Sequence, residues 1–256
     1  MQPGTAMRRL VALLAGLVAC ASPSSDDAVD DPGGKDDRGT SSRFVEVDPT
    51  HTNATFRAYI HAALDKLAAH DSELAHLTLA SIGAGRVRID ELADLTCNDF
   101  ERVRKDLPGL GLTAADFSLL KRRGSEVTAA IAGEIDGYMW SNRIYVSRGQ
   151  APQRLAATLV HEVNHVINRS EVGYYDDLPT SAFLHEYRAF HAERMFDPSY
   201  YDGVDLVDYV VTEYELDRGK IAPAILAAPL TPRLLPDADA WRTRAVDADT
   251  PDPACP

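Results

Sequence analysis

The stretch LVHEVNHVIN, residues 159–168, decides how the fold of this chain is interpreted. Its apolar residues recur at intervals of three and four, which is the spacing of one buried face of an α-helix. On the same helix His161 and His165 are one turn apart, so both imidazoles lie on one side of it. The stretch therefore predicts a helix with an apolar face and a separate face that carries two imidazoles.

A short strand and a turn are predicted in front of this helix. NRIYVS, residues 142–147, alternates apolar and polar side chains, as a short β-strand does. RGQAP, residues 148–152, then turns the chain. Pro152 suits the first turn of a helix, because the N–H that it lacks would have no partner there in any case. The helix itself is predicted over 153–168.

A second helix is predicted over 182–196, and it carries a glutamate in an apolar setting. Twenty residues separate His165 from this glutamate, Glu186. Phe183 precedes Glu186 by one turn and Phe190 follows it by one turn, so this face of the helix is apolar. A carboxylate that faces a core is costly unless it is paired or binds a metal ion. The sequence therefore predicts a cation near Glu186.

Two imidazoles and a nearby carboxylate are suited to a zinc ion. In catalytic zinc sites three protein ligands leave a fourth position open for water. Glu162 follows His161 directly and is rotated away from the line of the two imidazoles, yet it can reach a water bound beside them. This combination is typical of a metal site with its own general base.

The pattern His161-Glu-Val-Asn-His165, then twenty residues, then Glu186-Tyr-Arg-Ala-Phe, resembles the gluzincin division of the zincin metallopeptidases. It is most similar to small exported bacterial zincins with an E-[FY]-R-A-[FY] motif on the glutamate helix. The resemblance implies a zincin-like catalytic domain in which His161, His165 and Glu186 bind Zn²⁺. It also implies that Glu162 is the catalytic base and that the substrate is a peptide or protein.

The resemblance covers the segment from Asn142 to Phe196. It implies that Ile144 to Ser147 is the edge strand that holds an extended peptide through backbone hydrogen bonds. The chain lacks the N-E-x-x-S-D form of the thermolysin-type enzymes, so the further catalytic residues of that subgroup are not carried over. Residues 44–137 carry no motif of known chemistry.

Glu171 is a rival third ligand. In the metzincin form H-E-x-x-H-x-x-G-x-x-H, Asn168 takes the position of the glycine and Glu171 that of the last histidine. Asparagine can adopt a left-handed conformation, but glutamate is not the usual ligand there and no Met-turn follows. Glu186 is therefore preferred. The remaining alternative is that His161 and His165 are helix histidines with satisfied hydrogen bonds and that no metal binds.

Glu193 lies on the same face as Glu186, two turns further along the helix. It is a candidate for a residue that orients a metal ligand without binding the metal itself. The alternative is that it pairs with Arg188 or Arg194. Candidates for stabilising an oxyanion are Tyr174, Tyr175, His185, Tyr187 and His191.

Two other functions stay open. The first is a zinc hydrolase that acts on a non-peptide substrate, because no residue in the pattern identifies the substrate. The second is a non-catalytic surface lipoprotein in which a metal ion braces two helices. Glu162 argues against the second function, because a structural site needs no base. Structural zinc sites also usually fill all four coordination positions with Cys or His.

The N-terminal residues indicate export. Arg8 and Arg9 precede an apolar run from Leu10 to Ala19, which is too short to span a bilayer and matches the core of a secretory signal. LVAC, residues 17–20, resembles the lipobox of bacterial lipoproteins, whose cysteine, here Cys20, is lipidated and becomes the mature N-terminus. The resemblance implies a lipid anchor in the bacterial cell envelope. Because no aspartate follows the cysteine, it implies the outer membrane. The alternative is an ordinary signal with an unmodified cysteine.

An acidic segment over 21–42 follows this signal. It has too few apolar side chains to offset the cost of ordering its backbone, so it is predicted to be a solvated tether. Two further cysteines, Cys97 and Cys255, belong to the rest of the chain. Disulfides persist outside the cytoplasm, so the two are predicted to pair, with two separate thiols as the alternative.

The composition is that of one globular domain with appended segments. The chain has 256 residues, of which 45% are apolar, and its net charge of -13 argues against a nucleic-acid partner. The predicted fold is α+β and predominantly helical, with a single domain over 43–215 that divides into a helical part, 43–137, and a motif-bearing part, 138–215. A proline-rich tail follows over 216–256. Further helices are predicted over 44–79, 92–107, 113–122, 125–135 and 206–214, with Thr113 and either Thr180 or Ser181 as candidate N-caps.

Overall fold

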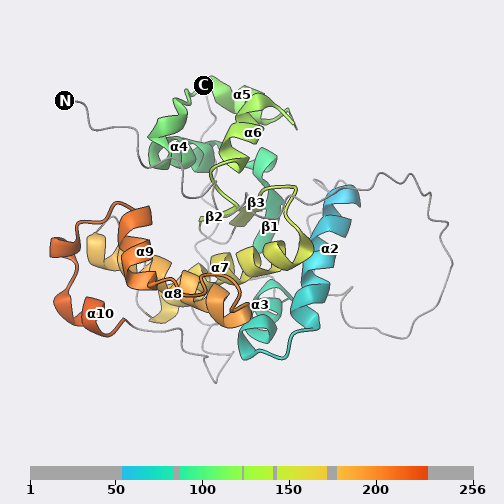
Figure 1. Cartoon of the computed structure of the whole chain (residues 1–256). Helices are drawn as coiled ribbons and strands as arrows, with labels where there is room; N and C mark the ends of the chain where they lie inside the picture. The colour runs from blue at the N-terminus through green and yellow to red at the C-terminus, as the bar shows by residue number, and fades with distance from the viewer. Residues whose placement is uncertain (1–53, 84–86, 123, 141–142, 172–177, 230–256) are drawn as a thin grey trace. The chain divides into compact units, whose positions relative to one another are not determined.

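Helix α7 (Pro152–Glu171) contains the histidine pair, and in a computed structural model of the chain it contacts elements that precede and follow it in sequence (Figure 1). The structure describes residues 54–83, 87–122, 124–140, 143–171 and 178–229, and it describes 169–171 by their backbone alone. Pro152 is the first residue of α7, as predicted, and the helix runs on past its predicted end at Asn168.

The described residues are predominantly helical, as predicted, with one small sheet. Besides α7, the helices are α2 (Ala54–Ala68), α3 (Glu73–Gly83), α4 (Cys97–Asp106), α5 (Asp116–Leu120), α6 (Glu126–Ala132), α8 (Pro179–Phe196), α9 (Leu206–Glu213) and α10 (Pro223–Ala227). Short 3-10 helices form η3 (Leu92–Asp94), η4 (Pro108–Leu110) and η5 (Arg218–Lys220). The α+β class with a helical majority is therefore confirmed.

The sheet has the strand order β1-β3-β2. β1 (Arg88–Glu91) pairs in parallel with β3 (Arg143–Val146), and β2 (Gly137–Trp140) pairs with β3 in antiparallel fashion. The strand predicted over 142–147 corresponds to β3. β1 and β2 were not predicted from the sequence.

The prediction that Ile144 to Ser147 forms an edge strand is wrong. β3 is the middle strand of the sheet and is paired along both of its sides. The physical reason is visible in its side chains, since Ile144, Tyr145 and Val146 are each 0% exposed. A strand that is apolar and buried on both faces is typical of the interior of a sheet that is covered on both sides.

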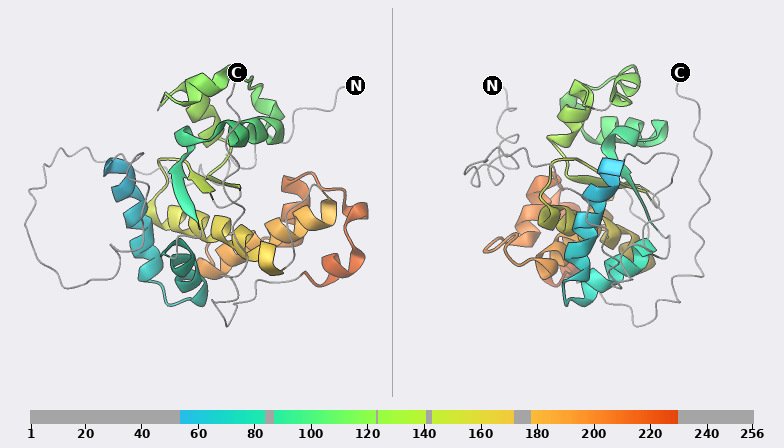
Figure 2. Two further views of the ribbon diagram at one scale, coloured as in Figure 1. Left: turned by 180° about the vertical axis from the view of Figure 1, so that it is seen from behind. Right: turned by 90° about the vertical axis from the view of Figure 1, so that its right-hand side faces the viewer.

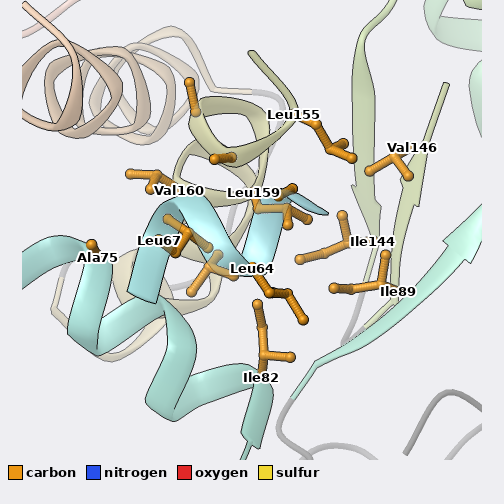
Figure 3. Close-up of a cluster of buried hydrophobic side chains, with 14 of the residues drawn as sticks. Leu64, Leu67, Ala75, Ile82, Ile89, Ile144, Val146, Leu155, Leu159 and Val160 are labelled. Atoms are coloured by element: carbon orange, nitrogen blue, oxygen red, sulfur yellow. The ribbon is translucent and has the colours of Figure 1, made fainter. Parts of the chain in front are cut away.

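One face of the sheet packs against α7 and α2. Ile144 and Val146 of β3 point towards Leu155 and Leu159 of α7, and Leu64 of α2 closes the same cluster (Figure 3). All five side chains are at most 1% exposed. The apolar face predicted for the histidine helix is therefore the face that α7 turns to the core.

The opposite face of the sheet is covered by α4, α5 and α6 (Figure 2). Tyr145, which alternates with Ile144 and Val146 along β3, belongs to this second cluster together with Phe100 and Leu120. The Tyr145 hydroxyl donates to Asp99 Oδ2 at 2.6 Å, which satisfies a buried carboxylate at the start of α4. α4 to α6 thus form a second core against this face of the sheet.

A third cluster joins α8, α9 and the segment that follows them. Phe183 and Phe190 of α8 pack with Leu206 and Val210 of α9 and with Ile221, which is 2% exposed. Packing against the glutamate helix therefore continues beyond residue 215, into the part of the chain that was predicted to be a proline-rich tail.

The single helix predicted over 44–79 is wrong, because the described part of that range forms α2 and α3 with a break between them. Ser72 is responsible for the break. Its Oγ accepts from the backbone N of Ala75 at 3.2 Å, and its own backbone N donates to His70 Nδ1 at 3.2 Å. Side chains that bond the backbone locally compete with the helix and favour a cap, even where the apolar spacing continues.

The helix predicted over 92–107 is also divided, into η3 and α4. Thr96 is the N-cap of α4, and its Oγ1 accepts from Asp99 N at 3.2 Å. A cap in the middle of the range ends one helical segment and begins the next. Over the range 125–135 the prediction holds better, since α6 begins directly after Ser125, whose side chain accepts from Thr128 N.

The predicted N-caps of α5 and α8 are wrong. Ala115 takes the N-cap position of α5, while Thr113 donates from N and Oγ1 to Asp116 Oδ2 at 2.7 Å and 2.8 Å. Leu178 takes the N-cap position of α8, because the helix already begins at Pro179. Thr180, one of the two predicted caps, accepts from Ala222 N at 3.0 Å and so joins α8 to the segment before α10.

The expected export of the protein can be compared with the described residues on two points, membrane-spanning helices and a disulfide. Among them, no helix has both the length and the hydropathy to cross a membrane. Cys97, at the start of α4, is disulfide-bonded. Cys20 and Cys255 lie outside the described residues, so the pairing of Cys97 with Cys255 stays a prediction.

Leu159→Ala tests the packing of α7. Leu159 is 0% exposed between α7 and the sheet, so its truncation is expected to lower the free energy of unfolding by about 2–5 kcal/mol. Chemical denaturation followed by circular dichroism measures this loss. Leu178→Ala is the matched control, because Leu178 is 65% exposed and its truncation is expected to cost about 0.5 kcal/mol or less. Equal effects of the two substitutions would contradict the packing described for α7.

Candidate metal centre

Helices α7 and α8 are antiparallel, and side chains between them define their register. Near the end of α7, Asn168 Nδ2 donates to the carbonyl oxygen of His185 at 3.0 Å, and Arg188 Nε donates to Asn168 Oδ1 at 2.6 Å. Near its start, Gln153 Nε2 donates to Oδ2 of Asp197, at the end of α8, at 3.1 Å. The partners follow one another in opposite directions along the two helices. The middle of α7 therefore faces the middle of α8.

This register brings His161, His165 and Glu186 together. Each offers one ligand atom, and these atoms all lie within 4.8 Å of one another. Nε2 of His161 and Nε2 of His165 are each 3.7 Å from Glu186 Oε2. Two ligand atoms of a tetrahedral zinc ion, each about 2.1 Å from the metal, are about 3.4 Å apart. The distances from Glu186 to the two imidazoles are thus close to what one zinc ion requires, and the distance between the imidazole nitrogens is at most 4.8 Å.

The chemistry of the donor set also fits zinc. Glu186 is 6% exposed, and its Oε2 is buried with no hydrogen-bond partner in the described part of the chain. A buried carboxylate oxygen without a donor is costly unless a cation lies beside it. Two imidazole nitrogens and one such oxygen form the His₂Glu set of catalytic zinc sites, which leaves one coordination position for water.

Glu193 is bound to His161 from the side away from Glu186. Its Oε2 lies 3.3 Å from His161 Nδ1, which leaves Nε2 of that ring directed at Glu186. Arg154 of α7 donates to Glu193 Oε1, and the Tyr201 hydroxyl donates to Glu193 Oε2 at 3.3 Å. The structure thus places Glu193 behind His161, where a carboxylate orients the ring of a metal-binding histidine. In the described contacts its ion pair is with Arg154, and not with the predicted partners on its own helix.

Tyr214 supports Glu186 in a comparable way. It is the C-cap residue of α9, and its hydrogen bond to the Glu186 carboxylate lowers the pKa of that group. Its ring packs against Phe190 with 6.2 Å between centroids, and Phe190 in turn meets the His161 ring edge-on at 4.6 Å. With 37% exposure, Tyr214 is far more open to solvent than the ligands that it adjoins.

The charges in the site depend on one another. Burial favours neutral His161, but the nearby carboxylates of Glu186, 3.7 Å away, and Glu193, 3.3 Å away, outweigh this effect and raise the pKa of His161 to about 10. Burial likewise favours the neutral acid at Glu186, but the nearby imidazoles of His165 and His161 and the Tyr214 hydroxyl prevail and lower its pKa. The carboxylates therefore favour positive charge between the two helices, which is the condition for binding a cation.

Glu162 differs from the other two carboxylates. It is 6% exposed and stands outside the donor set. Burial raises the pKa of Glu162 to about 7, against the lowering effect of His161 and with a further increase from Glu186. A carboxyl group with a pKa near neutrality can both accept and release a proton at physiological pH.

The structure lacks the turn at Asn168 that the metzincin form, with Glu171 as third ligand, requires. α7 continues as a helix through Asn168, whose side chain is bonded to His185 and Arg188. The left-handed turn of the metzincin form is therefore absent at Asn168. The side chain of Glu171 lies outside the described residues.

Of the three described candidates for stabilising an oxyanion, one lies beside a metal ligand and two lie in or beside the third cluster. His185 is 1% exposed and its ring stacks against His165 at 6.1 Å. Tyr187 stacks on Phe183 at 5.6 Å within the third cluster, and His191 packs beside Tyr187 at 5.9 Å. Tyr174 and Tyr175 lie outside the described residues.

Sequence reasoning missed Arg154, Asp136 and Tyr214. Arg154 donates from Nε and Nη2 to Asp136 Oδ2 at 2.9 Å and 2.7 Å while it also holds Glu193. Arg154 lies two turns before His161 on the same helix, so its position was a usable signal. The positions of Asp136 and Tyr214 follow from tertiary packing, and no spacing in the sequence indicates them. Comparison with protein-family models, curated proteins and solved structures finds no match to this chain.

Single substitutions in the donor set are expected to abolish zinc binding. His161→Ala, His165→Ala and Glu186→Ala each remove one of the three ligands found among the described side chains, and Glu171→Ala tests the rival ligand. Elemental mass spectrometry of the purified proteins is expected to find about one zinc per chain in the wild type and in Glu171→Ala, and none in the other three. Loss of zinc from Glu171→Ala with retention in Glu186→Ala would reverse the assignment of the third ligand.

Glu193→Gln is expected to weaken zinc binding without removing a ligand. The amide preserves the shape of the side chain but removes the charge that faces His161 Nδ1, so zinc affinity is expected to fall about 10–100-fold. Competition with a chromogenic chelator measures the dissociation constant. Glu126→Gln, an exposed position on α6, is the matched control and is expected to leave the affinity unchanged. Unchanged zinc affinity in Glu193→Gln would show that Glu193 does not affect metal binding through His161.

Proposed function

We propose that this chain is a zinc-dependent hydrolase, a metallopeptidase of gluzincin type that cleaves peptide bonds. The observation that carries the proposal is the convergence of His161, His165 and Glu186, on two different helices, to within 4.8 Å. Glu162, which follows the first ligand, supplies the base that such chemistry needs. The resemblance to gluzincins implies the same four residues in the same roles.

The proposed mechanism is metal-assisted hydrolysis. His161, His165 and Glu186 would hold a zinc ion, which would supply a water molecule with a pKa near 7 and a Lewis acid for the scissile carbonyl group. Glu162 would accept a proton from water as the water oxygen bonds to the carbonyl carbon, and it would deliver that proton to the nitrogen as the C–N bond breaks. Glu193 holds the ring of His161, and Tyr214 holds the carboxylate of Glu186.

Two features favour catalysis over a purely structural metal site. Three protein donors leave a position for water, whereas structural zinc sites usually fill four positions with Cys or His. The raised pKa of Glu162 suits a group that exchanges protons. A raised pKa of this carboxyl group would not help a purely structural site to bind its metal ion. The edge-strand role that the resemblance implies cannot belong to β3, because both of its sides are paired.

We further propose that the protein is exported and anchored to the bacterial cell envelope through a lipid on Cys20, in the outer membrane. The proposal rests on the sequence from Arg8 to Cys20 and on the acidic segment after it, which lie outside the described residues. A lipid-anchored metallopeptidase of this kind would act on peptides or proteins at the envelope. Nucleic acid is not among the proposed partners, because the chain carries a net charge of -13.

Glu162→Gln tests the proposed base. The amide cannot accept the proton of the attacking water, so turnover is expected to fall by about 10²–10⁴-fold while zinc content stays at that of the wild type. Hydrolysis of a broad library of fluorogenic peptides measures turnover, and elemental analysis measures the metal. His161→Ala is the control that is expected to lose both.

Two outcomes would contradict the assignment in different ways. Full turnover in Glu162→Gln would remove Glu162 from the role of base. Zinc binding without cleavage of any library peptide by the wild type would leave a hydrolase of non-peptide substrates or a metal-binding lipoprotein, and a screen with ester and amide substrates separates these two.

A further inference from the structure

Gly137, the first residue of β2, lies against the side chain of Glu162. A Cβ atom built on Gly137 would be 2.8 Å from Glu162 Oε1 and 3.1 Å from Glu162 Cγ. It would also be 2.7 Å from Thr158 Cγ2, one turn earlier on α7. Contacts below 3.0 Å are not tolerated by real Cβ atoms, so any side chain at this position would force a neighbour to move.

The backbone around Gly137 is the part least able to move. The carbonyl oxygen of Asp136 accepts from Ser147 N at 3.0 Å, from Ser147 Oγ at 3.1 Å and from Gln150 Nε2 at 2.8 Å. Gly137 itself is in register with Val146 of the middle strand. A shift of this segment would break several hydrogen bonds at once, whereas the Glu162 side chain can move by rotating about its own bonds.

The same segment is also connected to the metal ligands. Arg154 binds the Asp136 carboxylate with two nitrogens and also binds Glu193, whose Oε2 lies 3.3 Å from His161 Nδ1. Asp136 is therefore connected to the proposed ligand His161 through Arg154 and Glu193, and Gly137 lies directly against the proposed base Glu162. Asp136 thereby orients the ligand His161. Gly137, which has no side chain, leaves room for the carboxylate of Glu162.

We infer that Gly137 is a positioning residue for Glu162, because only a hydrogen at its Cα leaves room for the carboxylate to lie beside β2 and next to the metal ligands. This inference rests on the proposed function, in which Glu162 is the base, and it names the residue that sets where the base stands. Gly137 acts through Glu162 and is not itself a catalytic residue.

The test is the double substitution Gly137→Ala with Thr158→Ser in the full chain loaded with zinc. Thr158→Ser removes the Cγ2 methyl group and keeps the hydroxyl that donates to Gln150 Oε1 at 2.8 Å, so the remaining clash of the new methyl group is with Glu162. Relative to Thr158→Ser alone, kcat is expected to fall about 100-fold, as for a displacement of roughly 1 Å at a reacting group. Zinc content and KM are expected to stay unchanged.

Gly133→Ala is the matched control for adding a methyl group to a glycine. Gly133 has a φ of -77°, and a Cβ atom built on it would have its nearest neighbour 3.4 Å away, so this variant is expected to match the wild type in every measurement. A kcat for the double variant within about twofold of Thr158→Ser alone would overturn the inference. A fall in kcat that only follows a loss of zinc would also overturn it, because Gly137 would then act on the metal site and not on the base.

A crystal structure of the zinc-loaded double variant gives a readout that does not depend on activity. The Glu162 carboxylate is expected to be displaced from β2 while His161, His165 and Glu186 keep their places. An unmoved Glu162, with the new methyl group accommodated by a shift of β2, would overturn the inference. If the wild type hydrolyses no substrate, the proposed function fails, and this structure still decides whether Gly137 positions Glu162.

Discussion

Helix α7 packs against the hydrophobic core on one side and presents two imidazoles to α8 on another, and the rest of the described structure depends on this division. Leu155 and Leu159 pack into the core between α2 and the sheet, while His161 and His165 face α8. The helix cannot rotate about its axis without exposing the apolar face to water. The direction of both imidazoles is therefore set by side chains that have no chemistry of their own.

The second constraint is charge. α8 carries Glu186 and Glu193 into the interior, where they are 6% and 1% exposed. Isolated carboxylates at such depth would cost several kcal/mol each, so each has acquired its own set of contacts. Glu193 is held by Arg154, Tyr201 and His161, while Glu186 depends on the two imidazoles and Tyr214. Because well-packed apolar residues often stabilise a helix pair as well as a buried charge network does, the clear consequence of this network is the geometry that it imposes on His161 and Glu186.

The sequence predicted most of what is local. Helical spacing and the two histidines one turn apart were sufficient for α7, and an apolar face around a lone carboxylate singled out Glu186. β1 escaped prediction because two of its four residues, Asp90 and Glu91, are acidic. Both are nevertheless buried, at 4% and 5% exposure, and they pair with Arg88 and Arg148. β2 escaped prediction because Gly137–Trp140 has no alternation of apolar and polar side chains.

What remained beyond prediction belongs to tertiary structure. The contact of Arg154 with Asp136 joins a helix to the residue before a strand, and Tyr214 reaches Glu186 from a helix that follows α8. Neither pairing has a fixed spacing in sequence. Gly137 is a further example, because a glycine at the start of a strand has no signature until the side chain that approaches it is known.

The connection between β1 and β2 has a consequence for how such a protein can evolve. β1 leaves the sheet at Glu91 and the chain returns to it at Gly137, so α4, α5 and α6 form an excursion with a second core against the sheet. Both ends of the excursion lie on the same sheet, beside the middle strand, and its helices contribute no side chain to the donor set. Insertions and deletions are therefore expected to accumulate in the loops between the helices of this excursion among descendants of a common ancestor. The paired helices α7 and α8 and the short segment at Asp136 and Gly137 leave much less freedom for change.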